Sequence, residues 1–480
     1  MIINIQDDVL KLHALGLLDG MLLDKTTKQH IMWATGAYAS LGGRYEYNGE
    51  ITPDLITGEH ASVIKTRARK AMEQQSARTR QHAEVFTPLW MCRMMNDYAD
   101  KVWFGRKEVF FKDGTPTAAV EFPKGKKWER YVDSRRLEIT CGEAPYLVSR
   151  YDVETGEAIP IRERAGLLDR KLRVVGENTQ TEEEWLEWTM RAFWATYGYE
   201  FQGDNVLIAR VNLLMTFEEY LQERWKRKPT RAEYERIANI ITWNIWQMDG
   251  LTGTVPYGTL EGQFQQMDLF GMFGESGDED KKKQPRCLVH NWTGGGSVEF
   301  LSLPVKGKKA MKFDFIIGNP PYQEEIEGSS DRPIYNAFMD AVYKISDKAE
   351  LITPARFLFN AGKTPKAWNQ KMMEDTHLGE PYEGITQTFI SIGAFESEFE
   401  AQAALKYVKS KFTRTLLGIL KITQHNPGPK WKYVPLQDFT QDSDIDWSKS
   451  IPEIDQQLYK KYGLDEKEIQ FIESHVKEMA

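Results

Sequence analysis

The stretch Phe313–Tyr322, FDFIIGNPPY, restricts the fold of this chain more than any other part of its sequence. Its first half is apolar and β-branched, which predicts a buried strand. The two prolines that follow predict an abrupt end to this strand, because neither can donate a hydrogen bond to a neighbouring strand. The polar end of the stretch is therefore expected at the carboxyl end of a strand, where open α/β sheets bind their ligands.

Four residues at this strand end, Asn319, Pro320, Pro321 and Tyr322, predict a binding corner. The prolines restrict the backbone, so the Asn319 side chain and the Pro320 carbonyl can serve as two convergent acceptors. Tyr322 adds a flat apolar face. Two acceptors and a stacking surface suit a planar group with an NH2, such as the edge of adenine or an amide. The structural alternative is a proline-rich turn with Tyr322 as its cover.

The run Asp314–Tyr322 resembles the catalytic motif of amino-group methyltransferases, especially the N6-adenine DNA methyltransferases of restriction-modification systems. The resemblance implies an α/β fold with a Rossmann-like sheet that binds S-adenosylmethionine as cofactor. It also implies catalysis by Asn319, Pro320, Pro321 and Tyr322 on an adenine rotated out of double-stranded DNA, without a metal. A separate nuclease or specificity subunit is compatible with it, in a prokaryotic or phage-encoded restriction-modification or defence system.

An upstream element, Phe86-Thr87-Pro88 ahead of a predicted helix, resembles the methyl-donor motif that precedes the sheet in this family. Threonine followed by proline also starts helices in many unrelated proteins. The position of this element before Asn319 agrees with the gamma order of motifs.

The segment Leu137–Leu147 resembles the donor-binding loop of the family, in which an acidic strand residue precedes a glycine-containing turn. Glu138 takes the acidic position and Gly142 that of the first glycine. The sequence departs from the family pattern at Glu143 and at Ala144, where a second glycine is usual. A Cβ at Ala144 narrows the approach of backbone to ligand, which would weaken cofactor binding.

Two later strand ends also carry acidic residues. Glu200 ends a predicted strand, where a carboxylate can accept both ribose hydroxyls of a nucleoside, or can simply be an exposed strand-end charge. Asp249 resembles the family residue that faces the donor's adenine amine, although Met248 stands where glycine is usual. Together with Glu138, these residues predict one cofactor lying across one sheet. The resemblance assigns donor binding to Phe86, Thr87, Pro88, Glu138, Thr140, Cys141, Gly142, Glu200, Phe201, Asp249, Gly250 and Leu251.

Whole-chain properties limit the remaining classes. The 480 residues predict roughly two or three domains, without a membrane-spanning run or a secretory leader, so an intracellular, cytoplasmic protein is expected. Three widely spaced cysteines indicate neither a disulfide framework nor a zinc site. The net charge of −8 argues mildly against nucleic acid as partner, so the location of basic clusters matters more than their sum.

The predicted domains are a helical N-terminal region at 1–80, a catalytic domain at 81–375 with insertions at 101–136 and 252–310, and a C-terminal DNA-contacting, target-recognition region at 376–480. A basic helical stretch is expected over Ala61–Arg80, as a solvated face or a phosphate contact. The Lys112-Asp113-Gly114 sequence predicts a hairpin.

Two alternatives to DNA methylation follow from the same residues. A glutamine amide would fit the Asn319 corner as an amine does, which predicts a protein glutamine methyltransferase. The departures at Ala144 and Met248 instead favour a catalytically impaired, DNA-binding or partner-docking relative.

Overall fold

A computed structural model describes the chain in two compact units, Met1–Glu374 and Asp375–Ala480. The second unit begins beside the boundary expected at 375, whereas the N-terminal residues form one unit with the catalytic part. The residues described are 2–70, 87–258, 284–294, 296–303, 311–324, 332–354, 357, 363–375, 397–420 and 434–476.

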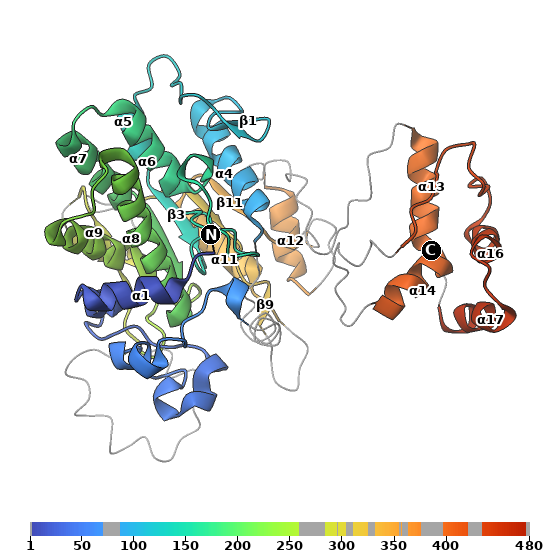
Figure 1. The fold of residues 1–480 in the computed structure, drawn as a ribbon, viewed down its shortest axis with the longest axis horizontal. Coiled ribbons are helices and arrows are strands. Elements are labelled where there is room, and N and C mark those ends of the chain that lie inside the picture. Colours follow the sequence, from blue (N-terminus) through green and yellow to red (C-terminus); the bar gives the residue numbers. More distant parts are fainter. Residues whose placement is uncertain are drawn as a thin grey trace. The chain divides into compact units, whose positions relative to one another are not determined.

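A five-stranded parallel sheet forms the centre of the first unit (Figure 1). Its order is β11-β8-β3-β4-β5, so the chain proceeds outward from β3 on one side and then returns to the other side with β8. The carboxyl ends of β3 and β8 therefore flank the point at which the strand order reverses, where open sheets bind ligands. The strands are β3 (Arg136–Ile139), β4 (Thr196–Glu200), β5 (Ile245–Gln247), β8 (Phe315–Gly318) and β11 (Ala349–Leu351).

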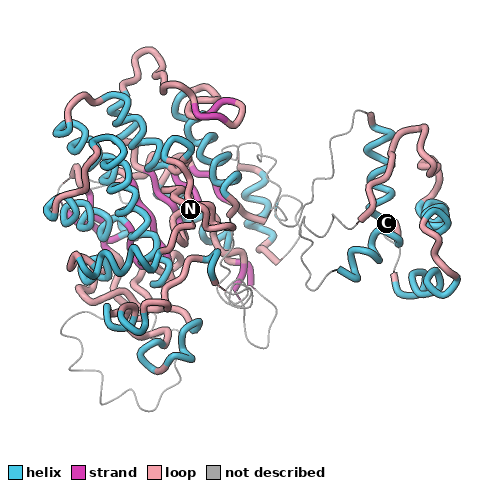
Figure 2. Tube along the Cα trace, viewed as in Figure 1, coloured by secondary structure: helices cyan, strands magenta, loops and turns pink. Residues whose placement is uncertain are grey.

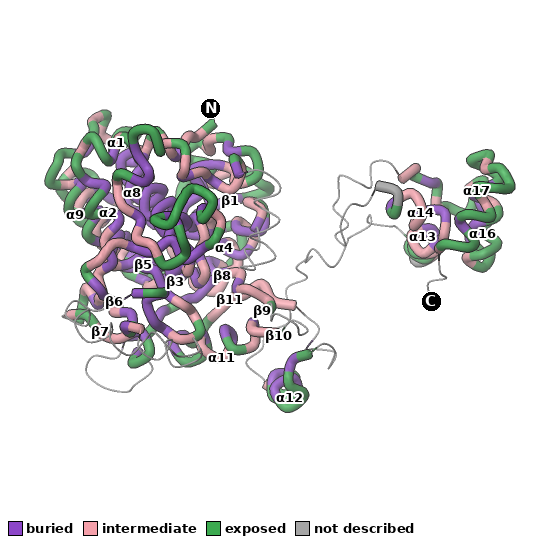
Figure 3. The backbone as a smooth tube through the Cα atoms, turned by 90° about the horizontal axis from the view of Figure 1, so that it is seen from below, coloured by how far each residue is buried: buried purple, intermediate pink, exposed green. Residues whose placement is uncertain are grey.

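Every residue of β8 is buried, as its continuous apolar run predicts, and the same holds for β3, β4 and β5, whereas β11 at the edge is half-buried (Figure 3). Phe315 and Ile317 belong to a large core that includes the helices α4, α6, α7, α8 and α9, whereas Ile316 belongs to a second core with α11. These alternating residues separate the two cores. The helices are α4 (Leu89–Phe104), α5 (Trp128–Val132), α6 (Leu167–Asn178), α7 (Glu182–Trp194), α8 (Gly203–Trp225), α9 (Arg231–Asn244), α11 (Tyr335–Ile345) and α12 (Lys366–Met373).

Three two-stranded antiparallel ribbons elaborate the first unit (Figure 2). The hairpin predicted at Lys112–Gly114 is present, with Asp113 and Gly114 in the left-handed region at φ 46° and 83°. A second ribbon directly follows Tyr322, whose carbonyl accepts from the backbone N–H of Ile334 at 3.1 Å. The ribbons are β1 (Phe111–Lys112) with β2 (Thr115–Pro116), β6 (Leu288–Asn291) with β7 (Gly296–Glu299), and β9 (Gln323–Glu324) with β10 (Arg332–Pro333).

The N-terminal region is less helical than predicted. It contains α1 (Ile5–Ala14), α2 (Leu18–Leu22) and several short 3-10 helices. The helix expected over Ala61–Arg80 is wrong for the part described, because residues 61–70 contain only a three-residue 3-10 helix at Arg67–Arg69. Long-range pairing overrides local propensity here: Lys70 is buried against Asp204, with 3.1 Å between Nζ and Oδ2.

The second unit has its own apolar core, which includes Tyr407, Phe412, Trp447 and Leu458. Its described helices are α13 (Glu398–Lys409), α14 (Lys411–Leu420), α16 (Ile451–Lys461) and α17 (Glu466–His475). Across the described parts of both units, none of the helices combines the length and the apolar character that a bilayer crossing requires.

Candidate active site

The two strand ends at the reversal point are joined directly. The Thr140 hydroxyl, just after β3, donates a hydrogen bond to the backbone carbonyl of Asn319, just after β8, at 3.2 Å. Gly318 makes this approach possible, since a Cβ there would lie 2.4 Å from Ile139 Cγ1 and 2.7 Å from the Ile139 carbonyl oxygen. The predicted catalytic corner and the predicted donor loop therefore lie side by side.

The Asn319 side chain is bonded at both ends. Its Nδ2 donates to the Thr87 hydroxyl at 3.1 Å, and its Oδ1 accepts from the Tyr322 hydroxyl at 3.1 Å. Burial raises the pKa of Tyr322 to about 12, so the phenol keeps the proton that it donates. Asn319, Pro321 and Tyr322 are half-buried and Pro320 is buried. Thr87 of the upstream element thus meets the corner, while its neighbour Phe86 lies outside the described residues.

The loop after β3 is bent by three residues in the left-handed region. Thr140, Gly142 and Ala144 have φ values of 47°, 53° and 64°. This conformation is unusual for a β-branched residue such as Thr140, and such strain tends to occur at functional sites. Gly142 faces open space, because a Cβ built on it meets no atom within 4 Å. Ala144 is fully buried in the core, so its methyl group does not fill that open space.

Two buried carboxylates hold this loop from within the protein. Glu138 accepts from the backbone N–H of Leu147 at 3.1 Å, and burial raises its pKa well above the usual range. Glu143, which departs from the family pattern, accepts from the Arg67 backbone N–H at 2.5 Å and from the Tyr151 hydroxyl at 2.7 Å. Both carboxylates act on loop geometry. Arg67 is 76 residues from Glu143 and Tyr151 is eight residues from it, and neither belongs to a recognisable motif.

Glu200 ends β4 as predicted and points its carboxylate at the donor loop. One oxygen accepts from the Gly142 backbone N–H at 2.9 Å, and the other accepts from the Gln202 backbone N–H at 3.1 Å. A carboxylate held in this way at a strand end can also accept from the hydroxyls of a ligand, since each of its oxygens has two lone pairs. The side chain is thus oriented by backbone donors on both sides.

Asp249 follows β5 by two residues and lies at the same edge of the sheet. Its carboxylate is engaged in its own turn, where Oδ1 accepts from the backbone N–H of Leu251 at 2.9 Å. Gly250 packs closely, since an added Cβ would lie 2.5 Å from Phe338 Cε1 and 2.9 Å from Tyr199 Cε2. Leu251 is 42% exposed and offers an apolar surface there.

Some predicted donor residues serve the scaffold. Cys141 is buried in the core and its backbone N–H donates to the Tyr199 carbonyl at 2.9 Å. Pro88 precedes α4, and the Phe201 carbonyl accepts from Gln247 Nε2 at 2.8 Å. No cluster of metal-binding side chains occurs within the ranges that the structure describes.

Glu350 was missed because one glutamate in a short strand carries no sequence signal. It pairs in β11 with Ile317, two residues before Asn319. Its Oε2 is buried and has no hydrogen-bond partner within the described ranges, and burial raises the pKa of this carboxyl to about 9.

The fold and this edge define an α/β protein in which the hydrogen-bonded pair Gly142 and Glu200 lies at the same sheet edge as the side-chain amide of Asn319. Residues 195–384 match the family model described as Eco57I restriction-modification methylase. The matched part, which includes β4, β5, β8 and β11, supports the predicted assignment to restriction-modification methylases, a family that suggests a DNA methyltransferase. A search of curated proteins found no match.

Proposed function

We propose that the protein transfers a methyl group from S-adenosylmethionine to N6 of an adenine in double-stranded DNA. This proposal rests on two hydrogen bonds at the sheet edge where the strand order reverses. Thr140 bonds to Asn319, and Gly142 bonds to Glu200. An amine-accepting corner and a nucleoside-binding carboxylate thus share one site. The match to restriction-modification methylases supports DNA as the substrate.

The donor side of the edge fits S-adenosylmethionine. The open space above Gly142 allows close approach of a ligand to backbone, and the Glu200 carboxylate, at the end of β4, is the type of group that accepts ribose hydroxyls. We assign the second oxygen of Asp249 and the exposed Leu251 to the donor's adenine, because both follow β5 at this edge of the sheet. When bound, the cofactor supplies an electrophilic sulfonium methyl group.

The acceptor side orients the target amine. Asn319 Oδ1 and the Pro320 carbonyl accept its two N–H bonds, which directs the nitrogen lone pair at the methyl carbon while Tyr322 stacks on the ring. The new N–C bond forms as the S–C bond breaks, and the proton lost from nitrogen passes to water. The base must leave the duplex first, at a cost of a few kcal/mol. Positioning and exclusion of water supply the catalysis.

A direct test replaces Asn319 with alanine and measures N6-methyladenine in DNA by mass spectrometry, with donor binding followed by calorimetry. We expect methylation to fall at least about 100-fold while donor affinity changes little, because the lost contact forms only with the target. The matched control is Asn239→Ala, which removes an exposed amide on α9. Full activity of Asn319→Ala would refute the assignment.

The two alternatives predict different results for the unmodified chain. A glutamine methyltransferase would label a peptide amide and leave DNA unlabelled. An impaired relative would bind no S-adenosylmethionine. Of the two departures behind this alternative, Ala144 and Met248, both side chains are buried in the core. The DNA-contacting role of 376–480 stays a prediction, and acidic side chains outnumber basic ones in residues 434–476.

A further inference from the structure

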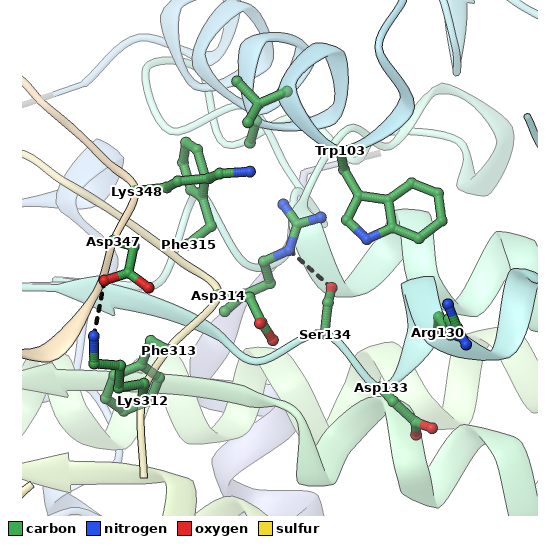
Figure 4. Close-up of a pocket in the computed structure, with 13 residues that line it drawn as sticks. Trp103, Arg130, Asp133, Ser134, Lys312, Phe313, Asp314, Phe315, Asp347 and Lys348 are labelled. Carbon is green, nitrogen blue, oxygen red and sulfur yellow. Dashed lines mark hydrogen bonds and ion pairs between the residues drawn. The ribbon is translucent and has the colours of Figure 1, made fainter. Parts of the chain in front are cut away.

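A second hollow, of about 410 Å³, lies at the amino ends of the strands, at the opposite edge of the sheet from Asn319 (Figure 4). Arg136 begins β3, Phe315 begins β8 and Lys348 directly precedes β11, and all three line it. The last turns of α4, with Trp103, form another wall. This volume lies within the range of about 300 to 1,000 Å³ that is typical of small-molecule sites.

The acidic side chains of this hollow already have partners. Asp133 is paired with Arg191 at 2.5 Å, Asp347 with Lys312 at 2.8 Å, and Asp314 accepts from the Arg135 backbone N–H at 2.7 Å. By contrast, the side chains of Arg130 and Lys348 make no hydrogen bond or ion pair with the described residues. Figure 4 shows Lys348 on one side of the hollow, and Trp103 and Arg130 on the other.

The buried guanidinium of Arg136, which also lines the hollow, carries a positive charge that no carboxylate fully balances. Arg136 is 1% exposed, and its Nε donates to the Ser134 hydroxyl at 3.1 Å, while Nη1 and Nη2 find no hydrogen-bond partner among the residues that the structure describes. Its nearest carboxylate, Asp100, is 3.6 Å from Nη2.

Asp100 cannot fully balance Arg136, because it is shared. Its two oxygens accept from the Tyr131 hydroxyl at 2.8 Å and from Arg170 Nη1 at 2.6 Å. A buried cation without a full partner is costly, and a nearby anion lowers that cost. The field of Arg136 therefore favours a negative group in the hollow.

We infer that this hollow binds a small organic anion, in which a carboxylate or phosphate is joined to a flat apolar body. Arg130 and Lys348 contact the oxyanion, and Arg136 attracts it through charge alone because its Nη atoms are covered. The Trp103 ring covers the apolar body, as aromatic walls do in such sites. The site is independent of the proposed methyl transfer, since it lies at the other edge of the sheet.

The test uses phenyl phosphate and benzoate as the two anionic probes and benzamide as their neutral counterpart, with binding measured by ligand-detected NMR. We expect saturable binding of at least one anion near or below about 1 mM, and much weaker binding of benzamide. The tighter anion identifies phosphate or carboxylate as the natural group. Saturating S-adenosylmethionine should leave this binding unchanged.

The variant Arg130→Ala/Lys348→Ala should weaken anion binding at least about tenfold, since two charge-assisted contacts are lost. Both residues are exposed, so the fold should persist. The control Lys344→Ala removes an exposed lysine of α11 outside the hollow and should change nothing. Absence of binding by both anions, equal binding of benzamide, unchanged affinity in the double variant, or displacement by S-adenosylmethionine would each overturn the inference.

Discussion

The side-chain amide of Asn319 donates a hydrogen bond to the hydroxyl of Thr87 at 3.1 Å, across 232 residues of sequence. It connects the start of α4 to the end of β8, and thereby fixes which way the amide oxygen points. An asparagine amide has one donor end and one acceptor end, so holding the donor end leaves the oxygen as the group that meets a ligand.

Removing the Thr87 hydroxyl should therefore impair catalysis more than donor binding. We expect Thr87→Val to lower kcat for methylation about fivefold, because one hydrogen bond contributes about 1 kcal/mol to orientation. Thr87→Ser keeps the hydroxyl and should restore most of the rate. A raised S-adenosylmethionine Kd with unchanged kcat would show instead that Thr87 serves the donor.

Glu200 should control donor affinity. Glu200→Gln replaces a charged acceptor that receives the Gly142 N–H, and we expect the Kd for S-adenosylmethionine to rise at least about tenfold, as measured by calorimetry. Glu223→Gln is the control, because Glu223 is a 65% exposed carboxylate. An unchanged Kd in Glu200→Gln would remove Glu200 from the donor site.

A comparison of Gly142 with Gly114 separates the effect of backbone strain from the effect of filling the space that a ligand would use. Gly142 and Gly114 both have positive φ, at 53° and 83°, and an added Cβ meets no atom within 4 Å at either position. Alanine at each should cost about 1 kcal/mol of unfolding free energy, measured by denaturant titration. Only Gly142→Ala should also weaken donor binding. Equal donor affinities in the two variants would contradict the assignment of Gly142 to the donor site.

Glu350 should make stability depend on pH. Its folded pKa of about 9 exceeds its ordinary value of 4.5, so between these values the folded state retains a proton that the unfolded state loses. The contribution of Glu350 to stability therefore falls as pH rises, by at most about 1.4 kcal/mol per pH unit. Glu350→Gln removes this dependence, and its Tm relative to the unmodified protein should increase from pH 5 to pH 8. A constant Tm difference would show that Glu350 has a partner in solution.

Local patterns in the sequence predicted the parts of the site that depend on neighbouring residues. The strand end at Glu200, the turn at Lys112–Gly114 and the stop after Gly318 all follow from side-chain type and spacing, and the structure contains each of them. Because acidic residues end successive predicted strands, the sequence also predicts that these residues lie along one edge of one sheet.

Long-range pairing could not be predicted in this way. The burial of Lys70 against Asp204, the contact of Glu143 with Arg67 and the sharing of Asp100 depend on segments that meet only in the folded chain. Glu143 and Ala144 looked like defects when compared with the family pattern. In the structure, Glu143 secures the loop and Ala144 is fully buried.

The bond from Tyr322 to Asn319 Oδ1 has a consequence for substrate choice. Before DNA arrives, the phenol fills one of the two lone pairs of this oxygen, so an incoming amine either shares the oxygen with the phenol or displaces it. At the position of the adenine amine, thymine presents a carbonyl, which donates no hydrogen and would leave the two side chains bonded to each other. The Tyr322 hydroxyl, which is bonded to Asn319 Oδ1 before DNA binds, would thus favour adenine over its partner base, thymine.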